Sequence, residues 1–390
     1  MLLSMIREFF RKIRIEEYFL LFLITFFLTF IYLCNDFSVS KLKEYFFYNF
    51  KGGILCGVKY FLFIIYFFWF YIFFKLYLFL GNRFFKLSEL KNSNSLSGFF
   101  YIKNFYFKLK KFFIGISSFI IIFLLIIVFF ALVTSFLGKL AIDTKSRLIN
   151  DTLMFMDKYI LGDFGFIWCD NVKFLNFLAP IISWSFGLLG LMMGIALIVF
   201  WLYKSRFFFS KYIISMSLVL IIALPFWHYF PANSPSNGYF VNVYNKKIPY
   251  WIKVDLNKYN FDNYFFNFSK KFSSNQVAPV STFPSMHVAW AIIIAYLFFK
   301  LNKKTAFVFF PWCIFTILGT FCLAQHYFVD ILLSLPLVLI SILFSGLMVK
   351  IEKNYYRENK RDFLEEKLKN EIRNDLKIIL DFILRFVKLK

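Results

Sequence analysis

Long apolar segments, separated by short polar ones, make up most of this sequence. A membrane-spanning helix needs roughly 20 consecutive residues that are mostly apolar. About eight segments come close to that requirement, and the sixth is short because polar residues precede it. The pattern therefore predicts an all-α fold, a polytopic integral membrane helical bundle with about eight transmembrane helices. The segments are residues 18–34, 54–80, 112–137, 174–203, 212–230, 284–299, 306–323 and 327–349.

The composition agrees with this prediction and excludes other classes of protein. Of the 390 residues, 60% are hydrophobic and 17% are charged, whereas soluble domains carry about 45–50% apolar and about 25% charged residues. Disorder requires low hydrophobicity and few aromatic side chains, so a disordered chain is excluded as well. The net charge of +23 would suit a nucleic-acid binder, but a mean hydropathy of +0.67 does not. We therefore expect membrane lipids as partners and no nucleic acid, while the oligomeric state stays open.

Lysine and arginine collect in alternate connections between the apolar segments. Cytoplasmic connections of membrane proteins carry an excess of these residues. With eight spans, the basic segments all fall on one side, which we predict to be the cytoplasm. The opposite side receives loops 35–51, 141–173 and 231–283, so we expect a protein of the plasma or inner membrane. The basic residues outside the C-terminal tail are Arg7, Arg11, Lys12, Arg14, Arg83, Lys86, Lys91, Lys103, Lys108, Lys110, Lys111, Lys204, Arg206, Lys211, Lys300, Lys303 and Lys304.

The chain divides into three parts. Residues 1–111 hold the first two spans and a basic cytoplasmic linker, residues 112–349 hold the other six spans, and residues 350–390 form a charged tail. Apolar positions in the tail recur at steps of three and four, which predicts one apolar face on a helix. Such a helix could lie on anionic lipid, pack on a partner helix, or dock on its own protein. The apolar positions are Leu364, Leu368, Ile372, Leu376, Ile379, Ile383 and Phe386.

The cysteines show neither a C-x-x-C pair nor the spacing of metal ligands. Four of the five lie in apolar runs, where free cysteine behaves as a small buried hydrophobe. We therefore expect structural thiols rather than a disulfide framework or a zinc site. They are Cys34, Cys56, Cys169, Cys313 and Cys322.

Three histidines, His228, His287 and His326, are the only ones in the chain, and all lie at predicted outer ends of spans. Ionisable side chains near membrane depth are costly and tend to serve function. A lone histidine in such a place is more often a structural residue. Three on one face of the membrane favour a functional site.

The neighbours of two histidines indicate phosphate chemistry. Pro284 suits the first turn of a helix, and the free amides there, with the Ser285 hydroxyl, suit phosphate binding beside His287. If residues 326–330 are helical, Asp330 lies one turn from His326 on the same face. A carboxylate there can accept the imidazole N–H and make the other nitrogen a better nucleophile. One imidazole could then attack phosphorus while the other protonates the leaving oxygen.

These residues resemble the type 2 phosphatidic acid phosphatase superfamily of integral membrane lipid phosphatases. Pro284, Ser285 and His287 are similar to its second motif, proline-serine-x-histidine, and His326 and Asp330 to its third motif, histidine-x-x-x-aspartate. The resemblance covers residues 112–349 as a six-helix core, and Thr320 ahead of His326 looks most like the inositol phosphorylceramide synthase branch. The first two spans and the tail lie outside it.

The resemblance implies a role for each residue. His326 would be the nucleophile that becomes phosphohistidine, Asp330 would orient it, and His287 would be the general acid. Ser285 and nearby amides would hold phosphate oxygens. Members of the superfamily need no metal, and the sequence shows no metal-ligand cluster, so we expect neither a metal nor another cofactor.

The sequence also departs from the superfamily pattern. The first motif usually supplies a lysine and an arginine before a proline, but residues 229–235 contain neither cation. Gly319 and Thr320 stand where serine-arginine usually begins the third motif, and Ser334 replaces a usual glycine. Each donor of this type contributes about 2–4 kcal/mol of transition-state stabilisation. Candidate replacements are Lys246, Lys247 and His228, although residues in such places are more often solvated loop charges or interfacial polar residues.

The predicted function is a membrane lipid phosphatase or phosphotransferase that acts on phosphorylated lipid head groups through phosphohistidine, without metal. Whether the acceptor is water or an alcohol, as in inositol phosphorylceramide synthases, stays open. The alternative is a non-catalytic transporter or scaffold with the same core. Transporters often carry broken half-helices in two related halves, and the sequence shows no such pair.

Overall fold

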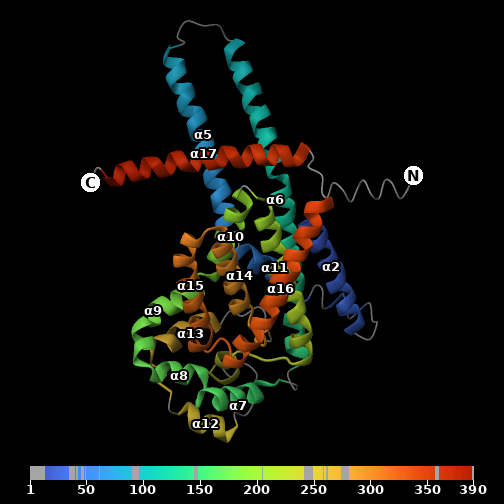
Figure 1. Ribbon diagram of the computed structural model, residues 1–390, viewed down its shortest axis with the longest axis vertical. Helices are drawn as coiled ribbons and strands as arrows, with labels where there is room; N and C mark the ends of the chain where they lie inside the picture. The colour runs from blue at the N-terminus through green and yellow to red at the C-terminus, as the bar shows by residue number, and fades with distance from the viewer. Residues whose placement is uncertain are drawn as a thin grey trace.

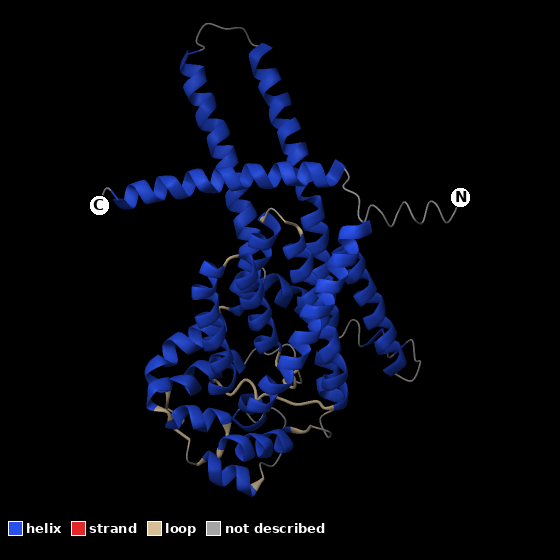
Figure 2. Cartoon of the chain, viewed as in Figure 1, coloured by secondary structure: helices blue, strands red, loops and turns tan. Residues whose placement is uncertain are grey.

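The computed structural model is all-helical in its described residues (Figures 1 and 2), and no β-strand occurs among them. Within them, four helices are long and apolar enough to cross a membrane, or five if one bent pair counts as a single span. The prediction of an all-α membrane protein is confirmed at that level, whereas the count of eight spans is not. The structure describes residues 14–34, 40, 43–44, 48, 50–60, 62–89, 96–144, 148–203, 205–240, 249–257, 259–260, 262–273, 281–355 and 360–388.

The helices follow the predicted apolar segments with some differences at their ends. They are α2 (Ile15–Cys34), α4 (Phe50–Tyr60), α5 (Leu62–Glu89), α6 (Leu96–Asp143), α7 (Asn150–Leu161), α8 (Gly165–Asn171), α9 (Lys173–Gly187), α10 (Leu189–Leu202), α11 (Phe207–Tyr229), η1 (Ser236–Phe240), α12 (Tyr250–Leu256), α13 (Tyr264–Ser273), α14 (Met286–Leu301), α15 (Lys303–Cys322), α16 (Phe328–Tyr355) and α17 (Lys360–Lys388).

Two of the predicted spans differ from the expectation. The fourth is broken into α9 and α10, which meet at an angle of 52°. The sixth, predicted as short over residues 284–299, is α14, which has the predicted length of 16 residues but begins two residues later, at Met286. In addition, α6 runs without interruption across residue 111, so the segment expected as a basic linker continues the helix of the third span.

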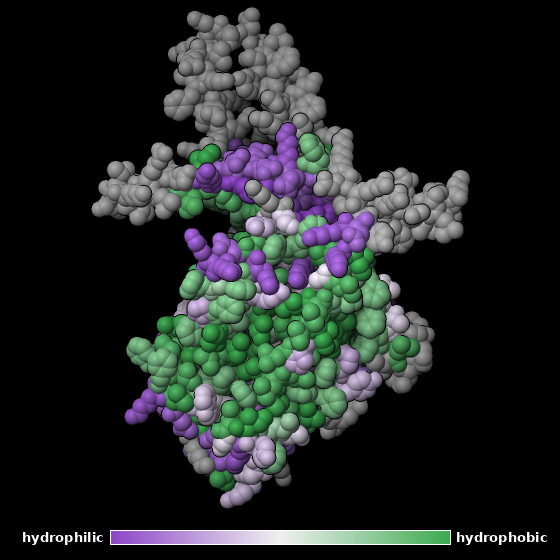
Figure 3. All heavy atoms as spheres, viewed as in Figure 1, coloured by the Kyte–Doolittle hydropathy of each residue, from purple (hydrophilic) through white to green (hydrophobic). Residues whose placement is uncertain are grey.

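The membrane helices pack around one apolar core, and consecutive helices α14 and α15 are antiparallel, whereas α2 runs parallel to α6 and α11. Helix α14 contacts α15, α11 contacts α16, and α2 lies against α6 and α11. Tightly packed aromatic side chains fill the centre of this core, including Phe27, Phe136, Phe200 and Trp201, each at most 1% exposed. Apolar side chains cover the middle of the face seen in Figure 3, and hydrophilic ones collect toward its two ends.

The two ends of the bundle carry different elements. Helices α7, α8, α12 and α13 cover the end at which α15 finishes and α16 begins (Figure 1). Helix α17 crosses the opposite end, where Leu368 and Ile372 are buried and where it contacts α6. Arg14 pairs there with Asp362 and Glu365 of α17, both at 2.6 Å. The tail therefore docks on its own protein at Leu368 and Ile372, whereas Leu376 of the same predicted apolar stripe is exposed.

Gly319 allows a close approach between α15 and α9. A Cβ atom at this position would lie 2.9 Å from Cβ of Phe186 and 3.1 Å from the carbonyl oxygen of Ile182. Contacts below 3.0 Å do not occur between real side chains without a shift, so only glycine fits. The absence of a serine at this position thus has a packing reason.

Candidate active site

His287 and His326 meet at the end of the bundle that α7 and α8 cover. Nδ1 of His287, in the first turn of α14, lies 3.1 Å from Nε2 of His326, in the loop between α15 and α16. On its other side the ring of His287 stacks on Phe186 of α9, with ring centroids 4.7 Å apart and an interplanar angle of 22°. The structure therefore brings together the two imidazoles that the sequence singled out.

Two acceptors fix the orientation of the His326 ring. Its Nδ1 lies 3.0 Å from the carbonyl oxygen of Thr282 and 3.3 Å from Oδ2 of Asp330. Because both partners are acceptors, Nδ1 must carry the proton, and the lone pair is then on Nε2. That nitrogen is the one that points toward His287.

Asp330 reaches His326 in a different way from the one expected. Residues 326 and 327 are not helical, since α16 begins at Phe328. Asp330 lies in the first turn of α16, and its Oδ2 accepts a hydrogen bond from the backbone N–H of Tyr327 at 2.9 Å. A carboxylate that reaches back to a residue before the helix satisfies an otherwise free amide. The prediction of a shared helical face is therefore wrong, although the contact itself exists.

The loop that carries His326 is held by backbone contacts. The N–H groups of Gln325 and His326 both donate to the carbonyl oxygen of Thr320, at 3.0 and 2.9 Å. Ala324 turns the chain with a φ of 52°, a left-handed conformation that costs a non-glycine residue about 1–2 kcal/mol. The N–H of Ser236 donates to the carbonyl oxygen of Ala324 at 2.9 Å and so supports this turn.

Ser285 is the N-cap of α14, and Pro284 precedes it with a cis peptide bond. The Ser285 hydroxyl accepts from the N–H of Val288 at 3.4 Å, and its side chain is buried. Ser334 donates from Oγ to the carbonyl oxygens of Ser285, at 2.9 Å, and of Asp330, at 2.7 Å. The serine that departs from the superfamily pattern thus ties the start of α14 to the start of α16.

Burial lowers the pKa of His326 to about 4, and the carbonyl oxygen of Thr282 acts in the opposite direction. The imidazole is therefore neutral at physiological pH, as a nucleophile must be. Its side chain is 6% exposed and that of Asp330 is fully buried, so the charge that develops on reaction is shielded from water.

The other predicted phosphate-binding residues are not assembled here. Lys246 and Lys247 lie outside the described residues. His228 packs its ring against Phe30 of α2 and Phe136 of α6, with centroids 5.9 and 6.3 Å apart. The structure thus leaves the cationic part of the predicted site without a described member.

A neutral polar segment, residues 232–237, runs beside the His326 loop instead. Thr282 donates from Oγ1 to the carbonyl oxygen of Ala232 at 2.6 Å and is the same residue whose carbonyl oxygen faces His326. Next in the chain, Asn233 is fully buried, and its side-chain amide has no hydrogen-bond partner within the described part of the protein. Unpaired buried amides cost about 1–3 kcal/mol, so they mark places where a ligand or water can bind.

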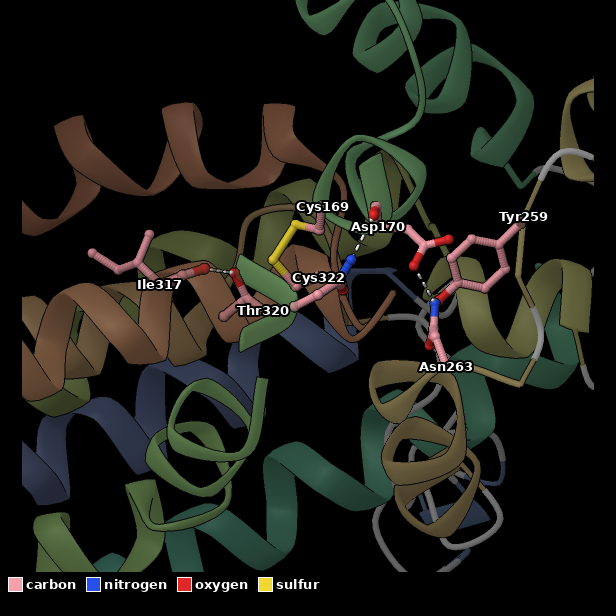
Figure 4. The surroundings of a disulfide bond; sticks show 8 residues. Cys169, Asp170, Tyr259, Asn263, Ile317, Thr320 and Cys322 are labelled. Atoms are coloured by element: carbon pink, nitrogen blue, oxygen red, sulfur yellow. Dashed lines mark hydrogen bonds between the residues drawn. A yellow bond between two sulfur atoms is a disulfide. The ribbon is translucent and has the colours of Figure 1, made fainter. Parts of the chain in front are cut away.

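A disulfide joins Cys169 of α8 to Cys322, the last residue of α15 (Figure 4). The expectation of structural thiols is therefore wrong for these two cysteines, whereas Cys313 is free and buried. No spacing rule could have paired them, because 153 residues separate them in sequence. They meet because α8 packs against the end of α15.

Sequence reasoning also missed Asp157 and Thr282. Thr282 contributes a backbone carbonyl, which no side-chain pattern reveals. Asp157 of α7 is 2% exposed and accepts hydrogen bonds from two amides at the start of α16.

Comparison with known proteins supports part of this picture. No curated protein and no solved structure matches the chain. Proteins of the PAP2 superfamily, whose name abbreviates type 2 phosphatidic acid phosphatase, are generally phosphatases and phosphotransferases. Residues 153–344, which hold both histidines, Asp330 and the disulfide, match the family model of the PAP2 superfamily.

Proposed function

We propose that this protein is a membrane lipid phosphatase or phosphotransferase that works through a phosphohistidine on Nε2 of His326. The observation that carries the proposal is the orientation of the His326 ring. Nδ1 faces two acceptors, at 3.0 and 3.3 Å, while Nε2 faces His287 at 3.1 Å. Nucleophile, orienting carboxylate and second imidazole are thus in the order that covalent catalysis requires.

The reaction proceeds by double displacement. The lone pair on Nε2 of His326 attacks phosphorus and the P–O bond to the leaving group breaks. His287, which enters this step as the imidazolium beside the phosphate anion, gives a proton to the departing oxygen and becomes neutral. Water or an alcohol then loses a proton to His287 and attacks phosphorus, which breaks the P–N bond and restores neutral His326. Asp330 and the Thr282 carbonyl stabilise the positive charge on the imidazole while it carries phosphate.

Substrate must separate the two rings. Phosphorus bonded to Nε2 occupies the space where Nδ1 of His287 now lies, only 3.1 Å away. A small rotation or shift of the His287 ring along Phe186 frees this space and leaves Nδ1 beside the phosphate oxygens. The stacking contact with Phe186 keeps the imidazole close during that movement.

Phosphate oxygens need hydrogen-bond donors. We assign this role to neutral polar groups and to lysines of the loop together. Ser285 and the amides at the start of α14 are one set. Asn233 is a second, because its amide is buried and unpaired within the described residues and its neighbour Ala232 contacts Thr282. Lys246 and Lys247 stay candidates for the cationic part.

We place the site on the extracytoplasmic side. The disulfide lies at the same end of the bundle as the histidine pair, and disulfides persist in oxidising compartments rather than in the cytosol. The sequence predicts basic cytoplasmic segments around Arg206 and Lys303, and these lie at the opposite ends of α11 and α15 from the site. Both observations support the same orientation.

The substrate is a lipid with a phosphorylated head group at the outer interface, such as phosphatidate, a polyprenyl phosphate or a phosphorylated glycolipid. The neutral character of residues 232–237 favours a transferase like the inositol phosphorylceramide synthases, in which an alcohol takes the phosphoryl group. A phosphatase would use water at the same position.

Purified protein incubated with labelled lipid phosphates is expected to move label to inorganic phosphate or to an alcohol acceptor. Release of phosphate without added alcohol identifies a phosphatase, and transfer only to alcohols identifies a transferase. The matched preparation is His326→Ala, which cannot form the covalent intermediate. Equal turnover in both preparations rules out the proposed chemistry.

Activity is expected to persist at pH 5 and to fall only as the pH drops through about 4, the lowered pKa of His326. The attacking imidazole must be neutral, and lowering its pKa keeps it neutral at pH values where an ordinary histidine, with a pKa of about 6.5, is protonated. A profile of kcat/KM against pH, taken from initial rates at lipid concentrations well below KM in detergent micelles, measures this limit. An acid limb centred near 6.5 contradicts the prediction.

A further inference from the structure

Asp157 occupies a position that no part of the mechanism above uses. It lies on α7, is 2% exposed, and accepts two backbone hydrogen bonds from α16. Oδ2 accepts from the N–H of Phe328 at 2.9 Å, and Oδ1 from the N–H of Val329 at 3.1 Å. Both oxygens are therefore occupied by the first two residues of the helix that carries Asp330.

These two amides lie between the residues of the candidate active site. Phe328 and Val329 follow His326 by two and three residues and immediately precede Asp330. The first amides of a helix have no partner within it, and a carboxylate that binds them is favoured by the helix dipole. Asp330 binds the amide of Tyr327, so the two aspartates together satisfy three successive amides.

The same part of the chain holds the other end of the His326 loop. Helix α8, which follows α7 after three residues, is joined to Cys322 by the disulfide. At the start of α8, a Cβ added to Gly165 would lie 3.3 Å from the ring of Phe321 and 3.5 Å from Oδ2 of Asp157. Helices α7 and α8 thus hold the chain on both sides of His326: the disulfide holds Cys322 before it, and Asp157 holds the amides of Phe328 and Val329 after it.

The position of Asp157 is costly, which argues against an incidental contact. Burial raises the pKa of its carboxyl group to about 7, against the effect of the Phe328 and Val329 amides, and nearby Asp330 raises it further. A neutral N-cap residue such as serine satisfies a helix start without burying a charge.

We propose that Asp157 is a positioning residue for His326: it holds the first turn of α16 in the register that keeps Asp330 and the ring of His326 in contact. The 3.3 Å separation between Nδ1 of His326 and Oδ2 of Asp330 leaves little tolerance before this contact is lost. Asp157 does not touch the substrate and acts only through the α16 backbone. This inference rests on the proposed phosphoryl transfer for its kinetic readout, but not for its structural readout.

The test compares Asp157→Asn with wild type in the full-length protein. Asparagine keeps the size of the side chain and one acceptor oxygen but replaces the other oxygen with a donor, so one of the two amides loses its partner. We expect kcat to fall at least ten-fold while KM stays within about two-fold, because substrate binding is untouched. Deuterium exchange of the peptide that spans residues 325–333 is expected to become faster in the variant.

The matched control is Asp163→Asn. Asp163 lies in the turn between α7 and α8 and accepts a hydrogen bond only from its own neighbour, the N–H of Phe164, at 2.8 Å among the described contacts. It carries the same substitution in the same segment without reaching α16. Both kcat and the exchange rate of residues 325–333 are expected to match wild type.

Two results overturn the inference. One is Asp157→Asn with wild-type kcat, and the other is a loss of kcat without faster exchange at the start of α16. If Asp157→Asn does not fold, Asp157→Glu replaces it, since the longer side chain displaces the cap, and wild-type kcat in that variant overturns the inference equally. If wild type shows no phosphoryl transfer, the proposed function fails, and the exchange measurement alone decides whether Asp157 holds α16.

Discussion

Replacing His326 with alanine is expected to lower turnover of lipid phosphates by roughly 10⁴-fold or more, the usual loss when a covalent nucleophile is removed. The reason is specific to the geometry, since Nε2 of His326 is the nitrogen left with a lone pair after Nδ1 binds Thr282 and Asp330. Acid-labile label should appear on wild type after brief exposure to ³²P-substrate and be absent from the variant. Persistent turnover in His326→Ala contradicts the mechanism.

His287 provides an internal comparison within the same experiment. Its role is to protonate the leaving oxygen, so His287→Ala should be slow with lipid substrates and much less impaired with an aryl phosphate, whose leaving group needs no proton. His228→Phe is the control for the loss of a histidine, because its ring packs against Phe30 and Phe136. Equal losses in all three variants would indicate general damage to the fold rather than loss of chemistry.

Removing the disulfide is expected to produce the largest loss of stability. The bond closes a loop of more than 150 residues, with a sequence separation of 153, and restricting a loop of that size contributes about 2–5 kcal/mol to the free energy of unfolding. The double variant Cys169→Ser/Cys322→Ser should unfold several degrees below wild type in detergent. Because Cys322 lies four residues before His326, turnover should fall as well.

Cys313→Ser is the matched control, since Cys313 is a free, buried thiol in the same helix as Cys322. Its unfolding temperature should stay close to that of wild type. Dithiothreitol should lower the unfolding temperature of wild type and leave that of the double variant unchanged. If the reductant affects neither protein and the double variant is as stable as wild type, the disulfide has no stabilising role.

Two features could be predicted from the sequence, the all-helical fold class and the closeness of His287 and His326, because both depend on local sequence pattern. Apolar segments of helical length required membrane helices, and placing His287 and His326 at the same ends of neighbouring spans was enough to expect them together. The start of α16 could not be predicted, since it depends on Asp157, which lies 171 residues earlier in the chain. The disulfide was missed for the same reason, because its two halves are joined by packing of α8 on α15.

The uncharged polar residues around the candidate site are a second feature that the sequence did not predict. Missing arginines are visible in the sequence, but what surrounds the site in their place is not. Asn233 became a candidate only because its amide is buried without a partner in the described residues. In the sequence, Ser334 stands only as a difference from the glycine of the resembling superfamily. In the structure, its hydroxyl donates to carbonyl oxygens at the start of α14 and of α16. Such residues act through three-dimensional contacts that carry no motif.

The close approach at Gly319 restricts which side chains this position can accept. A serine there, as in the usual third motif, would collide with Phe186, and Phe186 is the ring on which His287 stacks. Introducing a serine at position 319 would therefore disturb the ring that packs on His287. The packing of α15 on α9 and the stacking of His287 are thus coupled through Phe186, so a side chain added at position 319 would act on both at once.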